Sequence, residues 1–222
     1  MNELTARPAA RPQPPRARAG RPTREQAEAR HEELLAVALD HFLDKGYEPA
    51  TIEAIAGAVG MTKRTVYGLY ADKAALFRAA VHRAIERYSI PQERIEATDC
   101  GDLEQTLHNI ARLRIDLVAS PQGLKLQRII NTESYRFPEI FNEVYELGAL
   151  PTIRFLAQLL KRESAAGRLA IAEPAKAANV FMSMVVSGPV RVIVSGNVLT
   201  AAEIDERIAF AVQLFLNGAR PR

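Results

Sequence analysis

The sequence predicts an all-α protein in which an N-terminal three-helix unit precedes a larger helical bundle. Apolar residues recur three and four positions apart along most of the 222 residues, and no stretch alternates between apolar and polar residues as a half-buried strand does. Only 6% of the residues are aromatic, which argues against an aromatic-rich sheet protein. Helix starts are marked by capping boxes, at Thr23 with Gln26, Asp102 with Gln105 and Thr200 with Glu203.

The first 22 residues differ in composition from the rest of the chain. They include five prolines and five arginines, and few apolar side chains that could offset the entropy lost on ordering. We therefore expect residues 1–22 to form a disordered basic arm. Such an arm is either a solvated tail or a segment that contacts the backbone or minor groove of DNA.

Four helices are expected between residues 23 and 89. The first runs from Thr23 to the glycine at position 46, and two short helices follow it. The fourth opens at Asp72, ends before Pro91, and carries an apolar stripe wide enough to contact two units. Residues 23–71 thus form a small three-helix domain, and helix 72–89 connects it to a second domain within residues 72–222.

The second and third helices have the dimensions of a helix-turn-helix. A glycine-bearing turn separates them, and the capping residues Thr51 and Thr62 open them. Hydroxyl and cationic side chains crowd the first turns of the third helix, where they would meet phosphates and base edges in a major groove: Thr62, Lys63, Arg64, Thr65 and Tyr67. The spacing alone also fits a plain helical hairpin with a solvated basic face.

The residue string of this segment resembles the TetR family of bacterial regulators, without gaps. In that family the segment is the DNA-binding domain at the N-terminus, and a helical domain for ligand binding and dimerisation follows it. The resemblance is carried by Gly46-Tyr47, Thr51-Ile52-Glu53-Ala54-Ile55-Ala56, Gly60-Met61-Thr62-Lys63-Arg64-Thr65-Val66-Tyr67-Gly68-Leu69-Tyr70 and Asp72-Lys73-Ala74-Ala75-Leu76-Phe77.

The resemblance also implies roles for single residues. Arg64 stands where the family often has a small residue, so it either reads a guanine or grips a phosphate. Two further departures, Met61 for valine and Ala71 for proline, are conservative in packing. The side chains implied to face the groove are Thr62, Lys63, Arg64 and Thr65, and those implied to hold phosphates are Thr51, Tyr67 and Lys73.

The second domain is expected to consist of helices only. Its string Asn131-Thr132-Glu133-Ser134-Tyr135-Arg136-Phe137-Pro138-Glu139-Ile140 resembles the AefR-like type of TetR C-terminal domain. That resemblance implies a domain that binds a small-molecule effector and pairs two subunits. Helix starts are expected at Asp102, Pro121, Pro138, Pro151, Pro174 and Thr200.

Two charged residues lie on otherwise apolar helix faces of this domain, Arg114 and Glu133. They either pair with each other or snorkel to the surface, or they are the polar anchors of a largely apolar effector pocket. Aromatic side chains are candidates for the rest of the lining, although aromatic residues at helical spacing also fit an ordinary core: Tyr135, Phe137, Phe141, Tyr145 and Phe181.

The last two helices are candidates for a dimer interface. Between Val180 and Val194 the chain is apolar on nearly every side, so it needs cover all round. A four-helix interface built from two helices of each subunit would supply that cover. The interface residues we expect are Phe181, Val185, Val192, Ile204, Ile208, Ala211 and Phe215.

Other functional classes find little support in the sequence. It contains no glycine-rich phosphate loop, no Gly-x-Ser-x-Gly elbow and no paired-cysteine or His-Glu-x-x-His spacing, so we expect neither an enzyme nor a cofactor or metal site. The single cysteine and the lack of a leader fit the cytoplasm. The uncharged stretch between Lys176 and Arg191 is too short for a membrane span.

We therefore expect a homodimeric regulator that binds a palindromic double-stranded DNA operator and is released by a small, largely apolar effector. The repressing direction follows from the family resemblance alone. The alternative is a helical small-molecule-binding protein without affinity for DNA, which would leave the cluster from Thr62 to Lys73 without a role.

Overall fold

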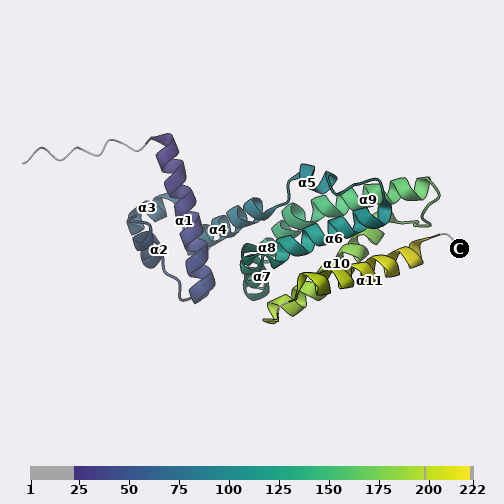
Figure 1. Ribbon diagram of the computed structural model, residues 1–222. Helices are drawn as coiled ribbons and strands as arrows, with labels where there is room; N and C mark the ends of the chain where they lie inside the picture. The colour runs from purple at the N-terminus through teal and green to yellow at the C-terminus, as the bar shows by residue number, and fades with distance from the viewer. Residues whose placement is uncertain (1–22, 198, 221–222) are drawn as a thin grey trace, which may run out of the picture.

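The computed structural model describes residues 23–197 and 199–220, and this part of the chain is helical and contains no strand (Figure 1). A small unit, called the head here, holds α1 (Arg24–Lys45), α2 (Ile52–Ala58) and α3 (Lys63–Leu69). The helix α4 (Lys73–Tyr88) leads from the head into a larger bundle, called the body. The predicted basic arm at residues 1–22 lies outside the described residues.

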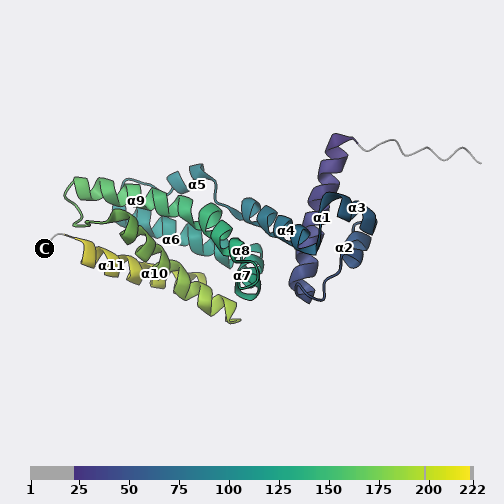
Figure 2. The same cartoon turned by 180° about the vertical axis from the view of Figure 1, so that it is seen from behind.

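The body is elongated, with its long helices side by side, and the head stands at one end of it (Figures 1 and 2). The bundle packs α10 against α6, α9 and α11. The elements of the body are α5 (Gln92–Glu96), α6 (Leu103–Ala119), α7 (Pro121–Glu133), α8 (Pro138–Glu143), the π-helix η1 (Val144–Ala149), α9 (Leu150–Ala165), α10 (Pro174–Val194) and α11 (Ala201–Ala219).

The predicted helix starts are confirmed except at Pro151, where α9 continues directly from η1, and one predicted capping box is incomplete. Thr23 and Thr200 form reciprocal boxes with the residues three positions on. The Asp102 carboxylate accepts a hydrogen bond from the Gln105 amide. The Gln105 side-chain oxygen does not accept from the Asp102 backbone N–H, and the Gln105 side-chain nitrogen donates to Asn109 at 3.0 Å.

Two features of the body were not expected from the sequence. A short helix, α5, occupies the segment between α4 and α6 that composition indicated as a polar link. The stretch expected to separate the helices at Pro138 and Pro151 is instead a continuous π-helical turn, η1. Such turns are frequent at functional sites, and this one lines a cavity described below.

Within the described residues, α10 is the one helix whose length and composition would also suit a membrane span. Lys176 and Arg191 lie inside it, and Pro189 interrupts it. Its inner face supplies Phe181 and Val185 to the core of the body. Part of its surface therefore belongs to an ordinary helical core.

The apolar core of the head extends into the adjoining end of the body, beside the separate core of the body. It joins head residues from α1, α2 and α3 to α4, and it continues into Ile129, Phe137 and Ile140 of the body. The Phe137 ring lies 5.0 Å from the ring of Tyr47 and 4.9 Å from that of Phe77, measured between centroids. Aromatic pairs at such distances contribute beyond the area they bury.

Lys73, at the start of α4, forms hydrogen bonds with the segment that connects α1 and α2. Its ammonium donates to the backbone carbonyls of Tyr47, Glu48 and Ala50 at 3.0, 3.0 and 3.2 Å, and lies 4.5 Å from the centre of the Tyr47 ring. A cation in the first turn of a helix is unfavourable to the helix dipole, and three carbonyl acceptors offset that cost.

We expect Lys73→Met to lower the free energy of unfolding by about 1–3 kcal/mol, because three carbonyls lose their shared donor. Urea denaturation followed by circular dichroism measures the change. The exposed Lys161 on α9 provides a matched control, Lys161→Met, which should unfold like the native chain. Native-like stability of Lys73→Met together with weakened DNA binding would show that this ammonium serves phosphate instead.

Candidate functional site

The third helix stands exposed on the side of the head away from the body (Figures 1 and 2). Val66 is its one buried residue and anchors it in the head core. Thr62 caps it, since the Thr62 hydroxyl oxygen accepts from the Thr65 amide at 3.1 Å. The two threonine hydroxyls also share a hydrogen bond of 2.8 Å. A short, rigidly capped helix thus carries its polar side chains outward.

The cations of α3 differ in their surroundings. Lys63 pairs with Glu53 in the first turn of α2 and lies 5.6 Å from the centre of the Tyr67 ring. This pairing lowers the pKa of the Glu53 carboxyl and raises the pKa of Lys63. Arg64 is exposed and forms no ion pair with the described residues. The Lys63 ammonium is thus engaged with a carboxylate, whereas the Arg64 guanidinium has no charged partner among the described residues.

The other predicted DNA contacts lie around α3. The Thr51 hydroxyl oxygen accepts from the Ala54 amide and caps α2, and the ion pair between Glu53 and Lys63 holds the first turns of α2 and α3 together. Lys73 instead turns its ammonium to the carbonyls described above. The structure therefore gathers Thr51 and the α3 side chains near one surface, with Lys73 engaged behind it.

Sequence reasoning missed two contacts that brace this surface from α1. The His31 ring stacks on Tyr70 and shares a hydrogen bond of 2.5 Å with its hydroxyl. Burial raises the pKa of that tyrosine. Arg30 reaches the Gly60 carbonyl in the turn between α2 and α3, at 3.5 Å. A histidine on the first helix gives no signal in the sequence that it will find a tyrosine 39 positions away.

The body contains a cavity of about 340 Å³ between α4, α6, α7, α8, η1 and α10. Three of the predicted pocket residues line it: Arg114, Phe141 and Tyr145. Gly123 opens α7 there, and a side chain at this position would meet the backbone carbonyls of Leu117 and Val118. The glycine therefore lets α7 turn close against the end of α6.

The remaining predicted pocket residues lie elsewhere. Glu133 lines a separate small hollow near Phe42, and it forms no ion pair with Arg114. Tyr135 is fully exposed, while Phe137 belongs to the core shared by head and body. Phe181 packs against Phe215 inside the body, with ring centroids 5.0 Å apart. Helical spacing predicted burial for the two phenylalanines, but it does not distinguish a core from a cavity wall.

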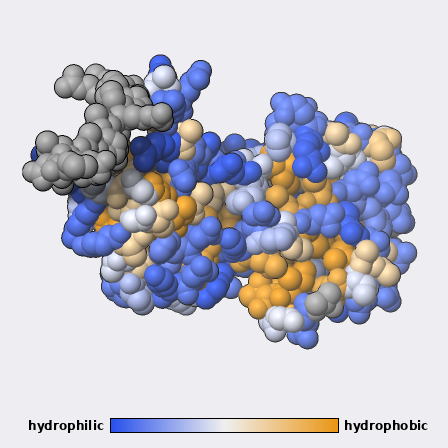
Figure 3. All heavy atoms as spheres, turned by 60° about the vertical axis from the view of Figure 1, so that its left-hand side comes forward, coloured by the Kyte–Doolittle hydropathy of each residue, from blue (hydrophilic) through white to orange (hydrophobic). Residues whose placement is uncertain are grey.

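The residues predicted for the dimer interface are mostly covered by the subunit's own bundle. Five of them are buried and two are partly buried, because α10 and α11 turn these faces toward α6 and α9. The opposite faces carry the exposed apolar side chains Val180, Phe210 and Leu214, which are 61%, 69% and 55% exposed. Figure 3 shows apolar side chains gathered on the body. The buried and partly buried residues are Phe181, Val185, Ile204, Ile208 and Ala211, and Val192 and Phe215.

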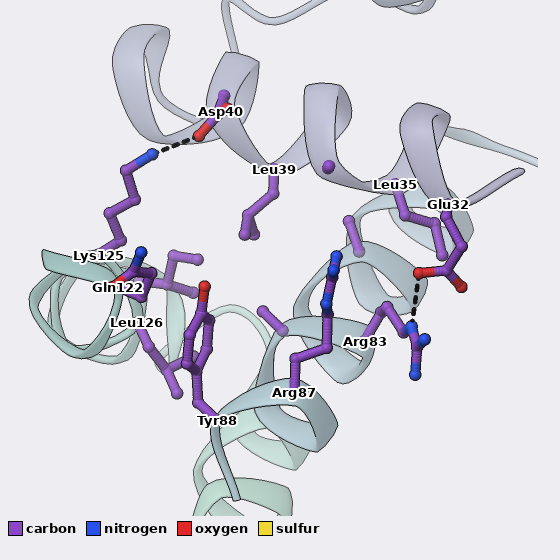
Figure 4. A pocket seen from close by; sticks show the side chains of 14 residues that line it. Glu32, Leu35, Leu39, Asp40, Arg83, Arg87, Tyr88, Gln122, Lys125 and Leu126 are labelled. Carbon is purple, nitrogen blue, oxygen red and sulfur yellow. Dashed lines mark hydrogen bonds and ion pairs between the residues drawn. The ribbon is translucent and has the colours of Figure 1, made fainter. Parts of the chain in front are cut away.

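A second hollow, of about 200 Å³, lies between α1, α4 and α7, where head and body meet (Figure 4). Lys125 of α7 pairs with Asp40 of α1 at 2.6 Å on one side of it. Arg83 of α4 pairs with Glu32 of α1 at 2.8 Å on another. Tyr88, together with Leu126, lines both this hollow and the larger cavity. The two spaces thus share a wall.

Comparisons with known proteins agree with this arrangement. A family model described as bacterial regulatory proteins, tetR family, matches residues 34–80. A second, described as AefR-like transcriptional repressor, C-terminal domain, matches residues 105–218.

Individual relatives and solved structures are similar over different shares of the chain. The flavonoid-responsive regulator FrrA is 31% identical with a TM-score of 0.70, over 88% of this chain and 99% of that one. A TetR-family regulator from Mesorhizobium loti shares the fold with a TM-score of 0.73 at 24% identity, over 90% of this chain and 100% of its own.

The HTH-type regulator YezE of Bacillus subtilis is 26% identical over 106 residues, which are 47% of this chain and 54% of that protein. The alignment therefore spans about half of that relative's length. One family model covers half of the present chain, and FrrA aligns over nearly its whole length above 30% identity. The chain therefore belongs to the TetR family of bacterial transcriptional regulators, as a DNA-binding regulator with an AefR-like C-terminal domain and not as an enzyme.

Proposed function

We propose that the chain is a ligand-responsive repressor that holds a palindromic operator as a homodimer and is released by a small, largely apolar effector. The observation that carries this proposal is the exposed helix α3, whose hydroxyl and cationic side chains stand at one end of a molecule that holds a cavity in its body. FrrA responds to flavonoids according to its name, which supports a response to a small organic molecule here. Such a repressor would bind chromosomal DNA in the cytoplasm.

We assign the groove contacts to Thr62, Lys63, Arg64 and Thr65. A seven-residue helix with its buried side limited to Val66 can enter a major groove over most of its surface. Thr51 and Tyr67 flank it and would contact phosphates, which position the protein without reading sequence. Lys73 would act indirectly, by holding the chain before α2.

The homodimer would form on the exposed faces of α10 and α11. Val180, Phe210 and Leu214 there have no cover from the described part of the chain, and a patch of large exposed apolar side chains marks an interaction surface. An interface of two helices from each subunit would bury them and set two heads for successive major grooves, about 34 Å apart.

The effector would act through the wall between the two hollows. A molecule in the larger cavity displaces Tyr88 and Leu126, which also line the hollow beneath α1. The ion pair between Lys125 and Asp40 ties α7 to α1 at the same place. An occupant that binds one arrangement of α1, α4 and α7 more tightly would shift the population of head positions.

DNA binding is tested with an operator fragment found by genomic footprinting of the purified protein. Fluorescence anisotropy should show that operator affinity falls steeply as the salt concentration rises. Contacts to phosphates release counterions from the DNA, and added salt opposes that release. Arg64→Ala should weaken binding about tenfold or more. Arg154→Ala replaces an exposed arginine on α9 and should leave operator affinity unaltered. Salt-independent binding would contradict the assigned phosphate contacts, and no footprint at all would favour the helical binding protein without DNA affinity.

Glu53→Gln should strengthen operator binding several-fold at neutral pH. The Glu53 carboxylate competes with phosphates for the Lys63 ammonium and repels the DNA backbone, and the amide does neither. The same anisotropy titration measures the change. Weaker binding by Glu53→Gln would mean that the ion pair orients Lys63 for DNA instead of restraining it.

The proposed dimer face is tested by Phe210→Glu combined with Leu214→Glu. Two carboxylates in an apolar contact would prevent pairing, so light scattering after size exclusion should give a mass near 24.5 kDa, against twice that for the native chain. Tyr135→Glu serves as the matched control, because Tyr135 is a fully exposed aromatic residue outside this face. A double variant that kept the native mass would place the interface elsewhere.

A further inference from the structure

The wall of the larger cavity contains a buried cation that has no counter-ion among the described residues. Arg114 is 8% exposed and lines the cavity from α6. One guanidinium nitrogen, Nη1, donates to the Gly148 carbonyl at 2.6 Å, while the buried Nε has no acceptor. No carboxylate oxygen of the described residues lies within 4.0 Å of its nitrogens. Burial lowers the pKa of this arginine.

A guanidinium in such a place is costly. Arginine stays protonated in proteins, so the charge cannot be removed by titration, and a buried charge without a partner destabilises the fold. Natural proteins pair such groups or use them to bind. The planar fork of an arginine presents parallel N–H donors that match a carboxylate in a bidentate pair. Nε belongs to that fork and is unused here.

The rest of the cavity wall defines what else the occupant must be. The described lining residues include no acidic one and are mainly aliphatic and aromatic, with Tyr88, Gln127, Tyr145 and Ser187 as the other polar side chains. The volume of about 340 Å³ falls in the range of small-molecule sites, about 300–1,000 Å³. An apolar body with one negative group would therefore match both the wall and the cation.

We infer that the cavity takes an organic monoanion, a carboxylate or similar anionic group on an apolar body, with its charge in the fork of Arg114. This inference rests on the proposed function, because it names the class of the effector. The competing explanation is that Arg114 only braces η1 through the Gly148 carbonyl. That role would persist with any occupant and would give no preference for charge.

A matched pair of probes separates these explanations. Decanoate and 1-decanol have the same chain length and differ in the charge of one end at pH 7.5. Both are titrated into the full-length chain in competition with the neutral dye N-phenyl-1-naphthylamine, whose fluorescence reports an occupied apolar cavity. The native chain should bind decanoate at least tenfold more tightly than decanol. Arg114→Met should bring that ratio to one or below while the dye still binds.

Two further variants control for charge and for folding. Arg114→Gln keeps a donor for the Gly148 carbonyl but lacks the charge. It should therefore lose the preference for decanoate as the methionine variant does. It replaces the methionine variant in the test if that variant fails to fold. Arg154→Met removes an exposed arginine from α9 and should retain the native ratio. Equal binding of the two probes by the native chain, binding of neither, or a preserved preference in Arg114→Gln would overturn the inference.

Operator release is measured separately, so that the two proposals can fail independently. If decanoate follows the expected pattern but leaves operator affinity unchanged, the anion site stands and the effector role of the cavity fails. If decanol releases the operator as well as decanoate does, the effector role stands and the preference for an anion fails.

Discussion

The apolar core of the head extends into α7 and α8 of the body, and the position of α3 relative to the body depends on this shared packing. Phe137, in the turn between α7 and α8, packs on Tyr47 of the head and on Phe77 of α4. Close-packed interiors resist continuous deformation, so a displacement in the body is passed to the head as a change of packing. The ion pair of Arg136 with Glu48 and the place of Arg136 over the Tyr47 ring strengthen the same contact.

The proposed switch follows from what adjoins this core. The larger cavity and the hollow beneath α1 share Tyr88 and Leu126, so an occupant on one side would alter the surroundings of α1 on the other. Because α3 is fixed to the head by Val66 and by its caps, any movement of the head would carry α3 with it. In a dimer held by α10 and α11, small rotations of two heads would change their separation, and an operator with fixed spacing would no longer fit.

Local signals were sufficient to predict much of this molecule. Thr23, Thr51, Thr62 and Asp72 cap the helices they were expected to cap, because capping depends on residues close in the chain. The partners of a side chain are less predictable. The stripe of α10 and α11 indicated apolar faces, but it did not show that Phe181 faces the subunit's own core and Phe210 faces outward. Likewise Arg114 and Glu133 share a pattern in sequence, yet only Arg114 borders the cavity.

The most direct test of the shared core is a double-mutant cycle between Tyr47 in the head and Phe137 in the body. Tyr47→Leu, Phe137→Leu and the double variant are compared by equilibrium urea denaturation, which gives the coupling free energy of the pair. The account predicts coupling of about 0.5–1.5 kcal/mol, as for other packed aromatic pairs, and one cooperative transition for the native chain. Additive effects, with head and body unfolding in separate transitions, would contradict it.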